Sequence, residues 1–188
     1  MSEEINKDIE TNDKDQKKVK MSPVDLKKAT NQQIEKNLYE LDEYNLKMEN
    51  FFNKQREDIN KELESLFGTL GTKNYKDFIE LQSHTLALRQ RIQEQISFYM
   101  QKLSKASTNY KQANADRVEY YMTGYGIKVS DGTRTKLIDR DLSERDRNVE
   151  AFQTHIEHLR ECRNACDQLN YAVKNMVGLI SYINILEK

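Results

Sequence analysis

Proline and glycine are scarce in this sequence, with one proline and six glycines among 188 residues. Turns draw heavily on these two residues, so their scarcity argues against an all-β or an α/β fold. Tryptophan is absent, and two cysteines are too few for a disulfide framework. We therefore expect an all-α protein whose cysteines are reduced thiols, as in a cytoplasmic protein.

Long apolar runs are also missing. No stretch reaches the roughly 18 apolar residues of a membrane-spanning helix, and the N-terminal MSEEINKDIETNDKDQ lacks the apolar core of a secretory signal. Apolar residues make up 37% and charged residues 32% of the chain. In average globular domains about 45–50% of the residues are apolar and about 25% are charged. This balance indicates a thin core spread along long surfaces, as in a coiled coil.

The sequence divides into a charged tail and a helical domain. Residues 1–21 contain almost nothing apolar, which predicts a disordered tail. Residues 22–188 form the predicted coiled-coil domain, in which Ser22 can cap the first helix and Pro23 suits its first position. Gly68 and Gly71 predict the end of that helix, near Leu66.

Apolar residues at spacings of three and four predict three helices, over about 22–66, 74–122 and 142–186. Each would be roughly 65–75 Å long at 1.5 Å per residue. Two short connections between matched helices predict an up-down-up antiparallel coiled-coil arrangement. In the first helix the polar residues Asn45 and Gln55 interrupt the apolar stripe. In the third, the stripe is nearly unbroken: Val149, Phe152, Ile156, Leu159, Cys162, Cys166, Leu169, Val173, Met176, Ile180 and Ile183.

Two segments of the helical domain stand out. Residues 123–136 concentrate glycine with Ser, Asp and Thr, which predicts a loop, and the alternation around Ile127 and Val129 favours a short hairpin-like excursion within it. The end of the third helix, AVKNMVGLISYINIL, carries apolar residues on more than one face. A single three-helix chain would leave part of that surface in water, so we expect self-association.

Charge is segregated along the chain. Residues 35–64 hold five basic and nine acidic side chains, whereas residues 102–140 hold eight basic and four acidic ones. The basic segment also carries several tyrosines. Single-stranded nucleic acid is bound by cations that track phosphates and by aromatic faces on which bases stack. The candidate DNA-binding residues are Lys102, Lys105, Lys111, Arg117, Tyr120, Tyr121, Lys128, Arg134 and Lys136. The competing interpretation is a solvated helix face with tyrosines in the apolar stripe.

Metal binding and catalysis find little support. His158, Cys162 and Cys166 share a helix face, but the first and last are roughly 12 Å apart along the helix and cannot share one zinc ion. We find no GxSxG nucleophile motif and no phosphate-binding glycine loop, and no pair of carboxylates is marked as an acid–base couple. We expect neither a metal nor a cofactor, and no enzymatic activity.

Part of the chain resembles the UvsY family of phage recombination mediators. The resemblance covers about residues 81–186 and lies in Tyr110-Lys111, in RVEYYMTG (117–124), in LIDRD (137–141) and in the final NMVGLISYIN (175–184). It implies a ring-like homo-oligomer that binds single-stranded DNA without sequence preference, in the host cytoplasm. It also implies a role in replication, recombination and repair: helping a phage recombinase to replace single-strand-binding protein.

Position by position, Lys111 and Arg117 match the basic residues that precede the family's Tyr-Tyr turn. Ala115 stands where members often have lysine, Asp116 beside it is acidic, and residues 1–70 have no clear counterpart in shorter members. The sequence thus favours a recombination mediator. A structural or adaptor coiled coil, such as a virion or scaffolding component without a nucleic-acid role, is the alternative.

Overall fold

The computed structural model describes residues 23–70, 75–124 and 130–186. The predicted tail, the cap Ser22 and the hairpin-like excursion around Ile127 and Val129 lie outside the described residues. The chain divides into two units, Met1–Lys36 and Asn37–Lys188, and the boundary falls within the first described helix. The fold described below is that of the second unit.

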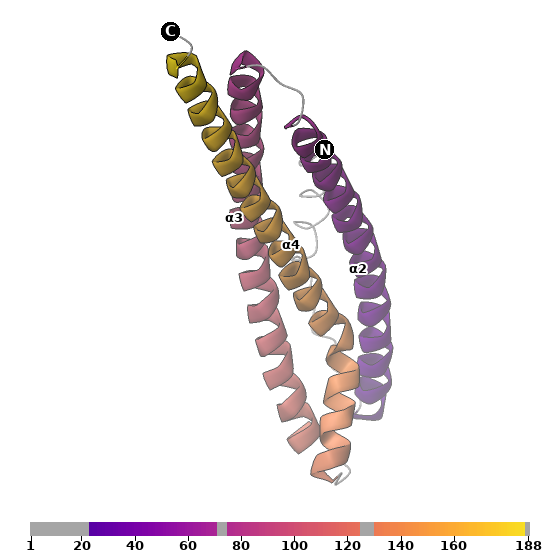
Figure 1. Ribbon diagram of the computed structural model, residues 1–188. Helices are drawn as coiled ribbons and strands as arrows, with labels where there is room; N and C mark the ends of the chain where they lie inside the picture. The colour runs from indigo at the N-terminus through magenta and orange to yellow at the C-terminus, as the bar shows by residue number, and fades with distance from the viewer. Residues whose placement is uncertain (1–22, 71–74, 125–129, 187–188) are drawn as a thin grey trace. The chain divides into compact units, whose positions relative to one another are not determined.

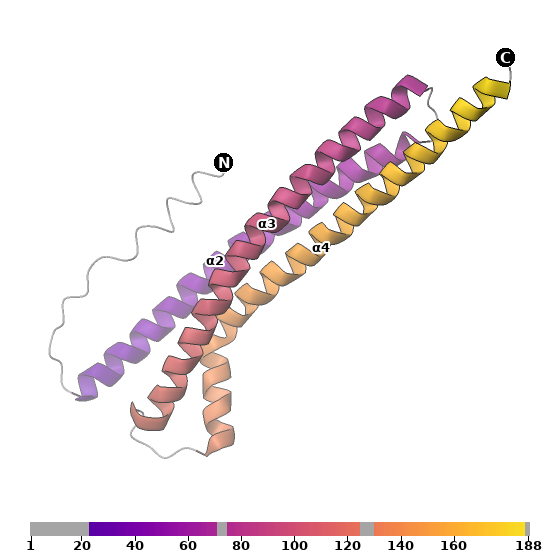
Figure 2. The same cartoon turned by 90° about the vertical axis from the view of Figure 1, so that its left-hand side faces the viewer.

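The protein is all-α. Its described elements are α2 (Pro23–Gly68), α3 (Tyr75–Glu119), a short π-helical turn η1 (Tyr120–Gly124) and α4 (Asp131–Leu186). From Asn37 onward the three long helices run side by side with alternating direction (Figures 1 and 2). This confirms the predicted up-down-up antiparallel arrangement of three helices.

The main core runs between the three helices and consists of the predicted apolar stripes. Phe52 and Ile59 of α2, Leu88 and Ile92 of α3 and Leu159 of α4 are all buried. The rings of Phe52, Tyr99, Phe152 and His155 meet at one level of this core, with centroids 4.1–6.4 Å apart. Each helix contributes at least one of these rings, so this aromatic layer fixes the helices against one another.

Polar residues in the apolar stripe are paired across helices. Asn45 is fully buried, donates to the Glu144 carbonyl oxygen at 2.7 Å, and accepts from Asn148 at 2.8 Å. Gln55 accepts a hydrogen bond from the Tyr99 hydroxyl at 3.0 Å. The two interruptions noted in the sequence therefore form hydrogen bonds between α2 and its neighbours. A one-turn slip of α2 would leave these buried groups unpaired, so they set its register.

A second, smaller core lies where α3 turns into α4. Tyr121, Ile138 and Leu142 are its buried members, and the partly buried residues packed on them also come from α3, η1 and α4. Figure 2 shows α4 bending after its first turns, so that these turns lie against the end of α3. This core holds the hairpin end together and includes the candidate residues Tyr120 and Tyr121.

The predicted start of α4 is wrong. α4 begins at Asp131 rather than near Leu142, so residues 131–136 are helix and not loop. Ser130 explains the early start, because its hydroxyl accepts from the Thr133 amide at 3.2 Å and its carbonyl from the Arg134 amide at 2.9 Å. Ser130 therefore caps the helix. Serine favours both helix caps and loops, so composition alone does not distinguish a capped helix start from a loop.

The apolar stripe of α4 outruns its partners. Cys162, Cys166, Leu169 and Val173 are buried as predicted, but Met176 and Ile183 are exposed. The two cysteines are packed as small apolar residues, and burial raises the pKa of the Cys166 thiol to about 11. The exposure beyond Val173 follows from the length of α2. Asn60 of α2 lies beside Cys162, so α2, which ends at Gly68, runs out near residue 170 of α4.

Candidate nucleic-acid interface

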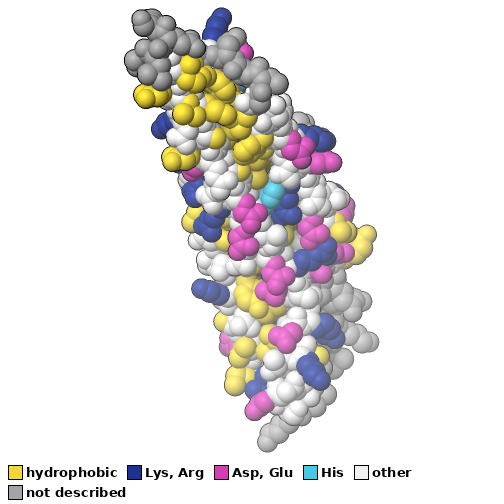
Figure 3. Space-filling view, viewed as in Figure 1, with side chains coloured by type: hydrophobic (Ala, Val, Ile, Leu, Met, Phe, Trp, Pro, Cys, Tyr) yellow, Lys and Arg dark blue, Asp and Glu magenta, His cyan; other side chains and the backbone are white. Residues whose placement is uncertain are grey.

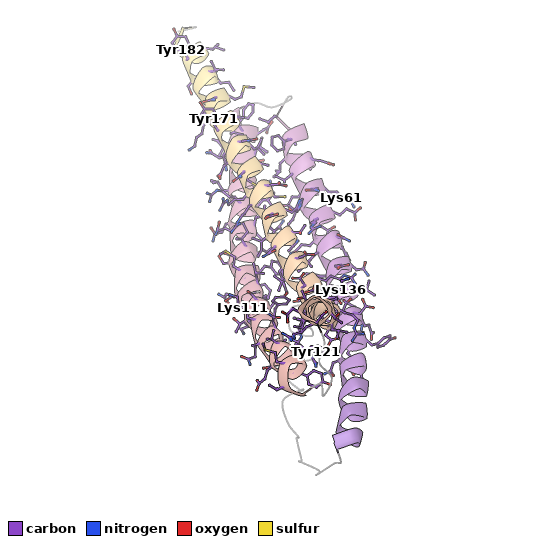
Figure 4. All side chains as sticks on the ribbon, turned by 90° about the horizontal axis from the view of Figure 1, so that it is seen from below. Lys61, Lys111, Tyr121, Lys136, Tyr171 and Tyr182 are labelled. Atoms are coloured by element: carbon purple, nitrogen blue, oxygen red, sulfur yellow. The ribbon has the colours of Figure 1, made fainter. Side chains whose placement is uncertain are left out.

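The end of α3, η1 and the first turns of α4 carry the candidate residues on three local structures. Figure 4 views the molecule from this end, with Lys111 on α3, Lys136 on α4 and Tyr121 between the two helices. The hairpin therefore places Lys111 and Lys136, which belong to different helices, at the same end of the described bundle.

The predicted lysines differ in how freely they can reach a ligand. Lys105, Lys111 and Lys136 are exposed. Lys102 is half-buried, and its ammonium lies over the Phe98 ring at 5.2 Å from the centroid. Lys128 lies outside the described residues. The three exposed lysines are therefore the cations best placed to contact phosphates.

The predicted tyrosines have different environments. Tyr120 is half-buried, and the Arg117 guanidinium lies 5.9 Å from the centroid of its ring. Tyr121 is 5% exposed, and its hydroxyl donates to Asp141 at 2.7 Å. Burial, followed by this hydrogen bond, raises the pKa of Tyr121 to about 12. Tyr121 is thus a protonated, packed residue of the hairpin core, and its ring meets that of Tyr120 edge-on with centroids 5.1 Å apart.

Both predicted arginines are half-buried and lie next to carboxylates. Arg134 pairs with Asp131 at 3.2 Å, one turn earlier in α4. Arg117 Nε lies 3.9 Å from Asp141 Oδ2. The pair is long, and the Arg117 side chain remains 24% exposed. Arg117 therefore serves the hairpin core and can still face a ligand.

Two residues at this site were not among the predicted ones. Asp141 has a buried carboxylate that links Tyr121 to Arg117, and Arg140 donates to the same carboxylate at 3.0 Å. Both belong to LIDRD, so their proximity to the tyrosines is a signal in the sequence. The contacts of Asp141 with Tyr121 and Arg117 join residues 20 or more positions apart, however, which helical periodicity does not predict.

The other chemistry in the described part of the chain is limited. Cys162 Sγ lies 3.4 Å from His158 Nε2, but no group of three or more His, Cys, Asp or Glu is arranged to hold a metal ion there. Nor does any helix contain, in its described residues, a stretch long and apolar enough to cross a membrane. Comparison of the whole chain with protein-family models, with curated proteins and with solved structures finds no match to any of them.

Proposed function

We propose that this protein is a recombination mediator that binds single-stranded DNA through the α3–η1–α4 hairpin. The observation that carries the proposal is the grouping at this end of Arg117 over the Tyr120 ring with the exposed Lys111 and Lys136 on the flanking helices. Cations for phosphates beside an accessible aromatic ring suit a flexible strand without sequence preference. The UvsY-like RVEYYMTG and LIDRD segments lie in the same hairpin.

The mechanism follows from binding alone. Several copies of the hairpin in one assembly would hold a strand in an extended, ordered form. A recombinase that nucleates on such a strand does not have to order it, so its cost of nucleation in place of single-strand-binding protein falls. Binding energy drives this exchange, and we propose no role for a metal or a nucleotide.

Replacing the three exposed lysines of the hairpin with alanine is expected to weaken binding to an oligothymidine and to flatten its salt dependence. Each phosphate contact contributes about 0.7 to the slope of log affinity against log salt on single strands, so losing Lys105, Lys111 and Lys136 should lower the slope by about 2. Fluorescence anisotropy of a labelled oligonucleotide at several salt concentrations measures this slope.

The matched control replaces three exposed lysines elsewhere, Lys54, Lys61 and Lys76, and changes the net charge equally. It should keep the slope of the unmodified protein. Equal losses in the two triple variants would show that only total charge matters. No binding by the unmodified protein would leave the alternative, a structural or adaptor coiled coil, for which the exposed apolar face of α4 is the favouring observation.

We also propose that the mediator is a homo-oligomer assembled through the end of α4. Met176, Leu179 and Ile183 are 42%, 59% and 51% exposed. Figure 3 shows hydrophobic side chains gathered where α4 ends, whereas charged side chains are mixed over the rest of this face. Lys174 is the one charged residue in the segment 171–183, so the surface offers no charge pattern for a different partner and suits a second copy of itself.

Introducing lysine at Leu179 and Ile183 is expected to reduce the native mass, because two charges on each copy would be buried in the interface. Light scattering coupled to gel filtration measures the mass. Leu46→Lys is the control, since Leu46 is 46% exposed but lies on α2, outside the end of α4. An unchanged mass in the double variant would place the assembly surface elsewhere.

A further inference from the structure

Asp141 is a buried acidic residue in the outermost part of the bundle. Its side chain is 2% exposed. Each carboxylate oxygen has its own partners: Oδ1 accepts from Arg140 Nη2 at 3.0 Å and Nε at 3.3 Å, while Oδ2 accepts from the Tyr121 hydroxyl at 2.7 Å and lies 3.9 Å from Arg117 Nε. A buried carboxylate is retained only when it is paired, so this geometry depends on both arginines.

The two arginines are held by the same carboxylate but are not used up by it. The Arg140 side chain is 70% exposed and that of Arg117 is 24% exposed. Both approach Asp141 with the Nε edge of the guanidinium. The guanidinium atoms closest to the carboxylate are Nε and Nη2 of Arg140 and Nε of Arg117. Two positive charges face one negative charge, so the group retains a net positive charge towards solvent.

We infer that Arg117 and Arg140, both oriented by Asp141, form a two-arginine site for a backbone phosphate of single-stranded DNA. This inference rests on the proposed function and adds Arg140 as a contact residue and Asp141 as a positioning residue. Planar guanidinium groups with free N–H donors match the oxygens of a phosphodiester, and fixing them beforehand reduces the ordering cost of binding. The Tyr120 ring lies beside Arg117, 5.9 Å from the guanidinium carbon to the ring centroid, and limits the positions that this guanidinium can take.

Removing the Asp141 charge should change DNA affinity in opposite directions, depending on whether its positioning role or the net charge dominates. Asp141→Asn adds one positive charge to the protein, which by itself would strengthen binding to DNA. If Asp141 orients the two arginines, the variant should instead bind an oligothymidine about threefold or more weakly, because the guanidinium groups must then be ordered during binding. Asp139→Asn is the matched control, because it changes the net charge by the same amount at an exposed position two residues away. It should bind as tightly as the unmodified protein or more tightly.

Arg140→Gln removes one of the two arginines and keeps the Asp141 carboxylate with its hydrogen bond from Tyr121. A lost charge-assisted bond to a phosphate is expected to lower affinity about tenfold and the salt slope by about 0.7. Arg160→Gln is the control, because Arg160 is an exposed arginine about 30 Å further along α4 and loses the same charge. Thermal melting followed by circular dichroism shows whether each variant is folded, and Arg140→Gln still decides the question if Asp141→Asn does not fold.

The possible results separate the inference from the function on which it rests. If the unmodified protein does not bind DNA, both are overturned. If it binds and Lys111→Ala weakens binding, but Arg140→Gln behaves like Arg160→Gln, the lysines bind the strand and the two-arginine site is wrong. If Asp141→Asn binds more tightly, as Asp139→Asn should, Asp141 opposes binding by its charge and does not position the arginines.

Discussion

Replacing Phe52 with alanine is expected to lower the free energy of unfolding by about 3–5 kcal/mol. Phe52 is 3% exposed, and its ring stacks on His155 at 4.1 Å and meets Tyr99 and Phe152 edge-on at 5.3 and 5.5 Å. Alanine would leave a cavity at the level where α2, α3 and α4 share aromatic contacts. The long, narrow core has few residues at each level, so its neighbours cannot fill that space.

Chemical denaturation followed by circular dichroism measures this loss. The adjacent residue provides the control, because Phe51 is 41% exposed and Phe51→Ala removes the same side chain from the same helix. We expect that control to cost below about 1 kcal/mol. Similar losses in the two variants would mean that helix propensity or residual structure, and not the aromatic layer, determines the stability of α2.

The sequence was sufficient to predict the helices because their signals are local and repeated. Pro23 marks the start of α2, and Gly68 is its last residue. Ile156, Leu159 and Leu169 were placed in the apolar stripe by spacing alone, and they are buried. An apolar stripe that repeats over many turns tolerates a polar residue such as Asn45 without losing its period, so the interruptions did not obscure the fold.

Two boundaries, the last buried turn of α4 and its start, depend on relations that spacing does not express. The stripe of α4 continues in sequence through Ile183, but it is buried only as far as α2 accompanies it, and the length of α2 is a property of another segment. The start of α4 at Asp131 depends on Ser130, whose side chain caps a helix here although the same residue type favours loops. Neither the last buried turn of α4 nor its first residue can be read from the local sequence alone.

The candidate site was predictable in composition but not in geometry. Residues 102–140 are rich in lysine, arginine and tyrosine, and the exposed Lys111 and the pairing of Arg117 with Tyr120 agree with that pattern. Burial of Tyr121 could not be inferred, because its partner Asp141 is 20 residues away and counts in the sequence only as one more acidic residue. The structure changes its role from a base-stacking residue to a residue that fixes the hairpin.

Acidification is expected to destabilise the protein through His155. This residue is fully buried, and burial, followed by the nearby positive charges of Arg56 and His158, lowers its pKa to about 3. Its Nε2 lies 2.8 Å from Gln55 Oε1, which can only accept, so Nε2 carries the proton of the neutral ring. A second proton would go to Nδ1, which is buried without an acceptor among the described residues. Charging His155 is therefore costly in the folded state.

The sign of the pH dependence follows from proton binding in the two states. In the unfolded chain the histidine pKa is about 6.5, so between about pH 6.5 and pH 3 the unfolded state binds the extra proton and the folded state does not. Stability is fully present above pH 6.5 and falls with decreasing pH through this window, by up to about 1.4 kcal/mol per pH unit. Between pH 7 and pH 5, His155 alone should remove roughly 2 kcal/mol.

His155→Phe isolates this contribution, because phenylalanine can stack on Phe52 but cannot take up a proton. Its free energy of unfolding should fall by roughly 2 kcal/mol less than that of the unmodified protein between pH 7 and pH 5. His158→Gln provides a comparison, because His158 is half-buried and burial also lowers its pKa. Its effect on the pH dependence of stability should be smaller than that of His155→Phe. Parallel curves for His155→Phe and the unmodified protein would mean that His155 is protonated within the folded core, and that the aromatic layer opens to water in acid.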